Sequence, residues 1–223
     1  MPITFTHSEP GGHLTNEDAF EVRPHPEDGS CWVGSLADGQ GGQPGGAEAA
    51  RLACRITIES VLSRPIASLS KPGTWVEALR RADEAVLADA WAGRTTLIGF
   101  AVLGGQILGA SNGDSALWVA GADGRVVDLT AHQPKNPPIG SGGAEPMPFV
   151  AKLPGSWVAL AMTDGVWKYA GRDGVRAAMR GSRGQDLIAA LLARARLPRS
   201  GELQDDFTAV VLQDPVESDP VMA

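Results

Sequence analysis

The sequence has few cysteines, no block of basic residues and no long apolar run, and each shortage narrows the class of protein. Cys31 and Cys54 are the only two cysteines in 223 residues. Each lies in an apolar segment, which favours two buried reduced thiols over a disulfide between them. The net charge of −7, without any cluster of Lys and Arg, argues against binding to nucleic acid. No apolar run reaches the ~20 residues that a transmembrane helix needs, so no membrane association is predicted.

The beginning of the chain also lacks the features of a secretory signal. Residues 1–9 contain neither a basic n-region nor an apolar h-region. A cytoplasmic location is therefore expected.

The composition that remains is typical of one globular domain with many turns. The chain is long enough to bury a multilayer core, and 43% of its residues are hydrophobic. Its 28 glycines and 16 prolines indicate many turns, which fits a strand-rich fold. Because no internal repeat or interdomain linker is present, residues 1–212 are predicted to form a single domain. The polar, Pro-bearing residues 213–223 are predicted to be a disordered tail.

Hydropathy patterns predict strands and helices in separate groups rather than in alternating βαβ units. Strands are predicted at residues 3–7, 19–23, 31–37, 95–103, 106–112, 115–120, 125–129, 157–162 and 207–212. Helices are predicted at residues 46–62, 75–91, 172–180 and 185–195, with a short one after Asp164.

Two further features of this pattern bear on the architecture. The four strands between residues 95 and 129 are separated by Gly-Gly and Asp-Gly links, which predict an antiparallel meander. Residues 132–148 are broken by Pro and Gly and are predicted to be a long surface loop of the kind that often carries function. The simplest packing is an α+β fold, a four-layer α-β-β-α sandwich of two antiparallel sheets flanked by helices.

Short acidic motifs are scattered along the chain, most of them at the edge of an apolar stretch. They are Asn16-Glu17-Asp18, Asp38-Gly39-Gln40-Gly41-Gly42, Gly113-Asp114-Ser115, Thr163-Asp164-Gly165 and Asp205-Asp206-Phe207-Thr208. Carboxylates from the ends of separate strands can converge on one point, and ligand sets made only of oxygen suit Mg²⁺, Mn²⁺ or Ca²⁺. The pattern therefore predicts a metal-dependent hydrolase.

Each motif also has an ordinary structural interpretation. The glycine-rich segment after Asp38 is either a flexible turn or a place where the backbone approaches an ion or phosphate closely. Asp164 is either a ligand or a helix N-cap. Asp114 fits the tight turn of a hairpin, and the motifs at Glu17 and Asp205 fit solvated turns. The combination is more specific than any single motif.

That combination resembles the PPM/PP2C-type metal-dependent serine/threonine protein phosphatases in their short bacterial form. The motifs occur in the family's order, and Gly93-Arg94-Thr95-Thr96 is similar to the family's Gly-Thr-Thr strand start. The resemblance runs from Asn16 to about Leu212 and implies the same α-β-β-α sandwich. It implies a monomeric enzyme that hydrolyses phosphoserine and phosphothreonine in proteins and opposes a bacterial Hanks-type kinase.

The resemblance also implies a role for each acidic residue. Asp38 would bridge two Mn²⁺ or Mg²⁺ ions. The other ligands would be Asp164 and Asp205 on one ion, and Glu17 and the Gly39 carbonyl on the other. Asp18 would hydrogen-bond metal-bound water from behind, and Asp114, together with Asp164, matches a third metal site of bacterial relatives.

These roles agree with elementary electrostatics. The carboxylates of Glu17, Asp38, Asp164 and Asp205 carry four negative charges, which balance two divalent cations. Two ions that share a water lower its pKa and hold it in line with the phosphorus, so water would attack the ester directly. Neither cysteine lies in the C-x₅-R context of a cysteine phosphatase, which argues against a phospho-enzyme.

One position departs from the family's pattern. His13 stands where the family usually has an Arg that holds the substrate phosphate, four residues before the first Glu. Histidine is only partly charged at neutral pH and cannot make a bidentate fork, so His13 is either a phosphate contact or a loop residue without a role. This departure leaves a catalytically weak binding or regulatory module as an alternative function. A hydrolase of small phosphate esters is a further alternative.

Overall fold

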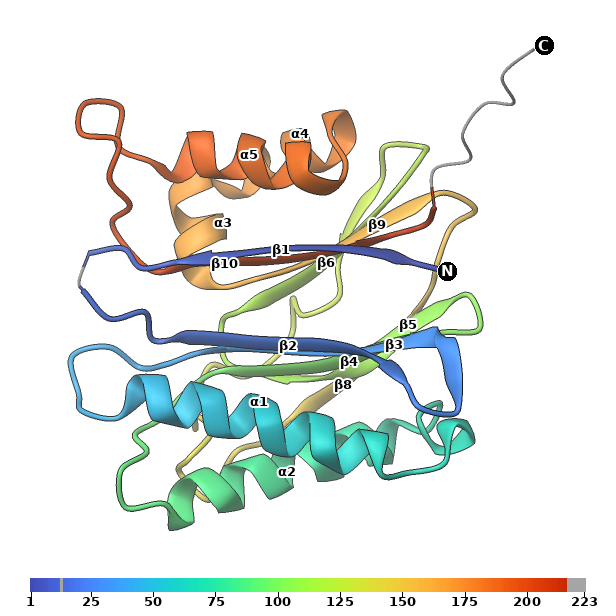
Figure 1. Cartoon of the computed structure of the whole chain (residues 1–223), viewed down its shortest axis with the longest axis vertical. Coiled ribbons are helices and arrows are strands. Elements are labelled where there is room, and N and C mark those ends of the chain that lie inside the picture. The colour runs from blue at the N-terminus through green and yellow to red at the C-terminus, as the bar shows by residue number, and fades with distance from the viewer. Residues whose placement is uncertain (13, 216–223) are drawn as a thin grey trace.

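Two five-stranded antiparallel sheets lie face to face in the computed structural model of the chain, with helices outside each sheet (Figure 1). The structure describes residues 1–12 and 14–215. Its four layers are the α-β-β-α sandwich predicted from the sequence.

The first sheet joins the N-terminal strand to strands from the last half of the chain. Its order is β1 (Ile3–Glu9), β10 (Phe207–Gln213), β9 (Trp157–Met162), β6 (Ala116–Gly121) and β7 (Val126–Asp128). Its outer face is covered by α3 (Asp164–Ala170), α4 (Arg172–Gly181) and α5 (Gly184–Ala195).

The second sheet is built mostly from the first half of the chain. Its order is β2 (Asp18–His25), β3 (Asp28–Asp38), β4 (Leu97–Leu103), β5 (Gln106–Asn112) and β8 (Met147–Lys152). Its outer face is covered by α1 (Gly46–Leu62) and α2 (Pro72–Ala88), which a short 3-10 helix at Ile66–Ser68 connects. Within the described ranges, no helix is both long and apolar enough to cross a bilayer.

The core consists of three apolar layers that follow from the period of two along each strand. In β9, Val158 and Leu160 face the helices α3–α5, whereas Ala159 and Ala161 face the other sheet. Because both faces of this strand are covered, every one of its residues is buried. The strand is therefore fixed in position, and so is the acidic residue that follows it.

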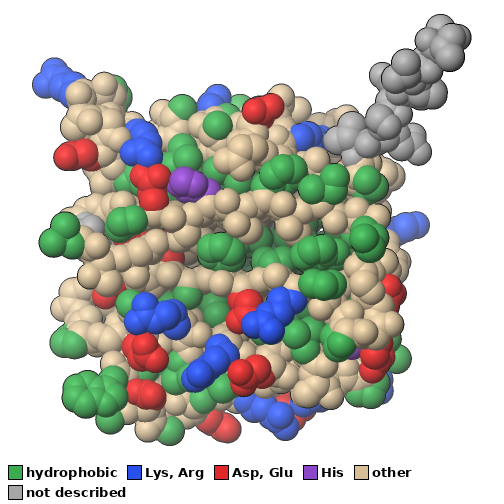
Figure 2. Space-filling model, in the orientation of Figure 1, with side chains coloured by type: hydrophobic (Ala, Val, Ile, Leu, Met, Phe, Trp, Pro, Cys, Tyr) green, Lys and Arg blue, Asp and Glu red, His purple; other side chains and the backbone are tan. Residues whose placement is uncertain are grey.

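The surface carries charges of both signs. Figure 2 shows Lys and Arg side chains interspersed with Asp and Glu over the layer of α1 and α2. Pairs such as Arg51 with Glu48 and Arg81 with Glu77 link neighbouring turns of these helices.

The predicted meander between residues 95 and 129 is wrong, because its two hairpins lie in different sheets. The β4–β5 hairpin belongs to the second sheet, whereas β6 pairs with β7 and β9 in the first. The chain changes sheets at Gly113, whose φ of 112° is a left-handed value that favours glycine. Turn chemistry shows where a strand ends but not which sheet the next strand joins.

Strand β8 lies partly inside the predicted loop and was not predicted. It begins at Met147, pairs with β5 and forms one edge of the second sheet. Pro148 is compatible with this position because an edge strand has one row of N–H groups without a ladder partner.

The bounds of α2 and β10 also differ from prediction. Helix α2 begins at Pro72 rather than at residue 75, since Pro is accepted in the first turn of a helix, and it ends at Ala88 rather than at residue 91. Gln213, predicted to begin the disordered tail, is instead the last residue of β10. It is buried, and its Oε1 accepts a hydrogen bond from the Gly184 N–H at 2.7 Å. The predicted tail from residue 216 onward lies outside the described residues.

Candidate metal centre

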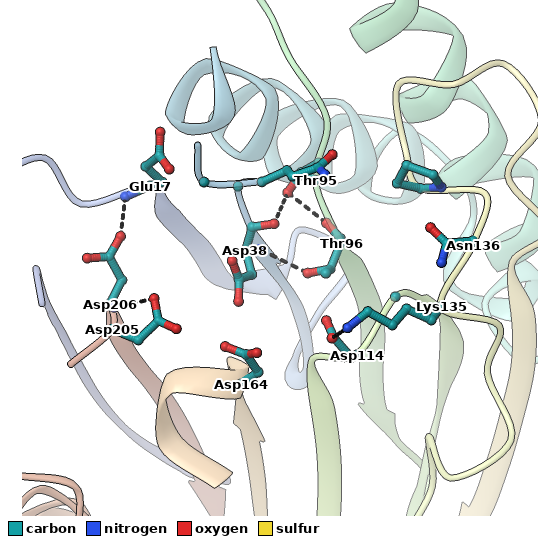
Figure 3. Close-up of a pocket in the computed structure, with 15 residues that line it drawn as sticks. Glu17, Asp38, Thr95, Thr96, Asp114, Lys135, Asn136, Asp164, Asp205 and Asp206 are labelled. Atoms are coloured by element: carbon teal, nitrogen blue, oxygen red, sulfur yellow. Dashed lines mark hydrogen bonds and ion pairs between the residues drawn. The ribbon is translucent and has the colours of Figure 1, made fainter. Parts of the chain in front are cut away.

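The acidic motifs meet at one end of the sandwich, around a cavity of about 330 Å³ (Figure 3). The predicted ligands that line it are Glu17, Asp38, Gly39, Asp114, Asp164 and Asp205. Glu17 and Asp38 lie at the ends of strands of the second sheet. Asp164 and Asp205 lie at the ends of strands of the first sheet. Asp114 lies where the chain crosses between the sheets. Both sheets are therefore needed to form this cavity.

Two threonines fix the backbone of Asp38 at the end of β3. The Asp38 N–H donates to Thr96 Oγ1 at 2.9 Å, and Thr95 Oγ1 donates to the Asp38 carbonyl at 2.8 Å. Thr96 Oγ1 also hydrogen-bonds to Ser115 Oγ at 2.7 Å, beside the crossing at Asp114. The Thr-Thr pair of the motif thus positions Asp38 while its carboxylate faces the cavity (Figure 3).

The glycine at position 39 is required by packing. A Cβ there would lie 2.4 Å from the carbonyl of Gly46 and 2.6 Å from the carbonyl oxygen of Glu17. The Gly39 N–H donates to that same Glu17 oxygen at 3.0 Å. The backbone of residue 39 therefore lies against the segment that carries Glu17.

The acids of the cavity disfavour one another's ionisation. Burial raises the pKa of Asp38 well above its ordinary value, and the charges of Asp18, Asp164, Asp114 and Asp205 raise it further. Burial also raises the pKa of Asp164, although the nearby Lys168 opposes that shift. A cation bound among these carboxylates would relieve this repulsion.

Asp18 lies behind Asp38, directly opposite it in the β2–β3 register. Its Oδ2 accepts a hydrogen bond from Thr163 Oγ1 at 2.9 Å, whereas its buried Oδ1 has no hydrogen-bond partner among the residues described. Burial raises the pKa of Asp18 to about 7, and the charges of Asp206 and Asp205 add to the effect. An oxygen without a partner in this position fits the predicted hydrogen bond to metal-bound water.

Asp206 has a positioning role that the sequence interpretation missed. Its Oδ2 accepts the Glu17 N–H at 2.6 Å, and its Oδ1 accepts the Gly11 N–H at 2.8 Å. Asp206 therefore ties the start of β10 to the segment that presents Glu17. The acidic pair Asp205-Asp206 is visible in the sequence, but the predicted ligand set includes only Asp205.

Two lysines also contact the acids. Lys135 Nζ lies 2.5 Å from Asp114 Oδ2. Lys168 Nζ lies 3.6 Å from Asp164 Oδ2 and 3.5 Å from Asp205 Oδ2. The hydrogen bond and charge of Asp114 raise the pKa of Lys135, and the charge of Asp164 raises that of Lys168, so both lysines stay cationic.

Neither lysine was predicted as part of the site. Lys168 follows Asp164 by one helical turn, a spacing that brings the two side chains together. Lys135 lies in the long loop, where no periodic pattern indicates its partner. His13, the predicted phosphate contact, lies outside the described residues.

The donor set fits hydrated divalent ions better than a compact all-protein cage. Across residues 1–12 and 14–215, no three His, Cys, Asp or Glu side chains are already gathered so as to hold an ion. The acids instead line the wall of the cavity, which leaves room for water. Mg²⁺ typically keeps several water ligands and uses only a few carboxylates, and Mn²⁺ suits the same oxygen donors.

Comparison with known proteins decides the family. A family model described as protein phosphatase 2C matches residues 8–136, which is more than half of the chain. The chain belongs to the protein phosphatase 2C family. No curated protein sequence matches it.

Solved structures of PP2C-type phosphatases share this fold across nearly their whole length. A bacterial serine phosphatase is 16% identical with a TM-score of 0.75, and the match covers 96% of this chain and 99% of the other. The catalytic domain of PstP, in complex with two manganese ions, is 19% identical with a TM-score of 0.75, covering 95% and 97%. RsbX in complex with magnesium is 14% identical with a TM-score of 0.72, covering 95% and 94%. At these identities the matches show the fold, which is that of a PP2C-type serine/threonine phosphatase.

Proposed function

We propose that this PP2C-family chain is a Mn²⁺- or Mg²⁺-dependent phosphatase that hydrolyses phosphoserine and phosphothreonine in proteins. The observation that carries the proposal is the convergence of carboxylates from both sheets on one cavity, where burial and the neighbouring charges raise the pKa of Asp38. Manganese in the PstP structure and magnesium in the RsbX structure support divalent ions as the cations.

The residues proposed to hold two ions are Glu17, Asp38, the Gly39 carbonyl, Asp164 and Asp205. When bound, the ions would acidify a water molecule and neutralise charge on the phosphate. Thr95 and Thr96 fix Asp38 between the two ions' ligands, and Asp206 holds the Glu17 segment. Asp18 would accept a hydrogen bond from behind through Oδ1.

Direct attack by water also fits the state of the cysteines. Cys31 and Cys54 are free and buried. Burial raises the pKa of the Cys31 thiol to about 11 and that of Cys54 to about 12. A thiol nucleophile needs a lowered pKa and access to substrate, so neither residue is suited to form a phospho-enzyme.

Removal of a ligand carboxylate tests this function. Asp38→Asn and Asp164→Asn should each lower Mn²⁺-dependent hydrolysis of p-nitrophenyl phosphate and of a phosphothreonine peptide by roughly 100-fold or more. Asp173→Asn is a matched control, because Asp173 is fully exposed on α4 and should leave the rate unchanged. Turnover that persists in EDTA, or full activity in both site variants, would contradict the proposal.

The second candidate is a catalytically weak binding or regulatory module on the same fold. The observation that favours it is the pairing of Lys135 and Lys168 with three of the acids, which partly neutralises the ligand set. Calorimetry with Mn²⁺ beside a turnover assay separates the two candidates. Binding of Mn²⁺ without hydrolysis of any phosphopeptide would support the module.

The physiological setting is proposed from the family resemblance. The substrates would be phosphoproteins made by a Hanks-type kinase in the cytoplasm, and the phosphatase would act as a monomer. Hydrolysis of phosphopeptides that exceeds hydrolysis of small phosphate esters would separate this setting from a small-ester hydrolase.

A further inference from the structure

We propose that the ammonium group of Lys135 takes the place of a third divalent ion beside Asp114, so that this phosphatase works with two ions and one built-in cation. The inference rests on the proposed metal-dependent function and concerns the outer edge of the same cavity. It replaces the sequence-based expectation that Asp114 and Asp164 hold a third ion.

The contact between the two side chains is direct. Lys135 Nζ lies 2.5 Å from Asp114 Oδ2, and both residues line the cavity. Figure 3 shows the lysine reaching from its loop to Asp114, at the side of the cavity away from Glu17. The carboxylate that a third ion would use is thus already paired with a cation.

An exposed ion pair on a flexible side chain would mean little by itself, because such pairs contribute at most about 1 kcal/mol. Here, however, the chain segment that carries Lys135 is hydrogen-bonded to the segment that carries Asp114. Three hydrogen bonds link residues 133–137 of the loop to residues 112–115 at the crossing between the sheets. The pairs are Gly113 N to Pro134 O (2.9 Å), Gln133 Nε2 to Ser115 O (2.6 Å) and Asn112 Nδ2 to Pro137 O (2.9 Å).

The remainder of the loop is anchored to helix α2. The buried carboxylate of Asp83 accepts the N–H groups of Gly140 at 2.6 Å, Gly142 at 3.1 Å and Ala144 at 3.2 Å. Ile139 also pairs with Thr95 through two backbone hydrogen bonds of 3.1 Å each. Lys135 therefore projects from a loop whose backbone is held on both sides, which keeps its ammonium group within reach of Asp114.

The other lysine of the cavity has a different geometry. Lys168 Nζ lies 3.5 and 3.6 Å from the inner acids Asp205 and Asp164, and it has no shorter contact with either carboxylate. Its looser pairing leaves these carboxylates open to the two inner ions. Lys135 alone combines a close contact with an anchored backbone, so it protects the outer position specifically.

The number of Mn²⁺ ions bound tests the inference without relying on activity. The full-length chain is titrated with Mn²⁺ by calorimetry, and free Mn²⁺ is followed in parallel by electron paramagnetic resonance. Wild type should bind two ions. Lys135→Met should bind a third ion, with a dissociation constant at least roughly tenfold lower than that of any weak third-ion binding in wild type, because the competing cation is gone.

Three further variants make the result specific. Lys135→Arg keeps the charge and should bind two ions. Lys135→Met combined with Asp114→Asn should lose the third ion again. Lys152→Met, an exposed lysine of β8 that does not line the cavity, should behave as wild type.

The outcomes separate this inference from the proposed function. Three ions of similar affinity in wild type, or an unchanged count of two in Lys135→Met, would overturn the role of Lys135 while leaving two-ion catalysis intact. Wild type that binds no Mn²⁺ would overturn both proposals.

Discussion

At the scale of single residues, the raised pKa of Asp18 should make the free energy of unfolding depend on pH. Its carboxylate is buried behind Asp38, and its pKa is raised from 3.8 to about 7. Between these values the folded, metal-free protein binds a proton that the unfolded chain has released. The free energy of unfolding should therefore fall as the pH rises from about 4 to about 7.

Asp18→Asn isolates this contribution. The unfolding free energy of the variant, minus that of wild type, should grow across the same window by up to about 4 kcal/mol. Urea unfolding in EDTA at several pH values measures the difference. A difference that stays constant from pH 4 to 8 would show that Asp18 ionises normally in the folded protein.

At the scale of elements, the long loop depends on one buried side chain of a helix. Asp83 of α2 accepts three backbone N–H groups of residues 140–144. Asp83→Ala should lower the free energy of unfolding by about 2–4 kcal/mol, because these donors lose a charged acceptor in a buried position. Thermal unfolding and hydrogen exchange of residues 139–144 measure the effect.

Glu84→Gln is the matched control for Asp83, since Glu84 is the next residue and is exposed. It should unfold like wild type. A loop whose exchange is unchanged in Asp83→Ala would show that the pairing of Ile139 with Thr95 alone holds it.

The sequence predicts elements well where the signal is local. Helix α1 has the predicted bounds because its apolar stripe and the glycines before it mark both face and start. Strand β8 was missed because Pro148 and the Gly-rich residues before it are typical of a loop, and only its pairing with β5 makes it a strand. The pairing of Lys135 with Asp114 was likewise out of reach, since it depends on how a long loop returns to the sheet crossing.

At the scale of the whole molecule, the ions are predicted to act as links between the sheets. Their proposed ligands come from both sheets, so bound Mn²⁺ should resist separation of the layers. At a free concentration of 100 times the dissociation constant, one ion stabilises the folded state by about 2.7 kcal/mol.

Thermal unfolding with and without Mn²⁺ measures this stabilisation. The transition temperature of wild type and of Asp173→Asn should rise with Mn²⁺, whereas that of Asp38→Asn should change little. An equal rise in all three proteins would place the stabilising ion somewhere other than this cavity.

The position of the site was predictable because acids at strand ends carry a positional signal. Asp38 and Asp164 each end an apolar run in the sequence, and the structure places both at the same cavity. The role of Asp206 was not predictable in this way. It depends on hydrogen bonds to Gly11 and Glu17, almost 200 residues earlier in the chain.

The division of the cavity between two sheets has a consequence for fragments of the protein. Glu17 and Asp38 are in the first quarter of the chain, and Asp164 and Asp205 are in its last third. A single proteolytic cut in the exposed β6–β7 turn, at residues 122–125, would leave each fragment with two of these four carboxylates. Activity recovered on mixing such fragments would then report directly on how firmly the two fragments recognise each other through strand pairs such as β1–β10 and β5–β8, without a covalent connection.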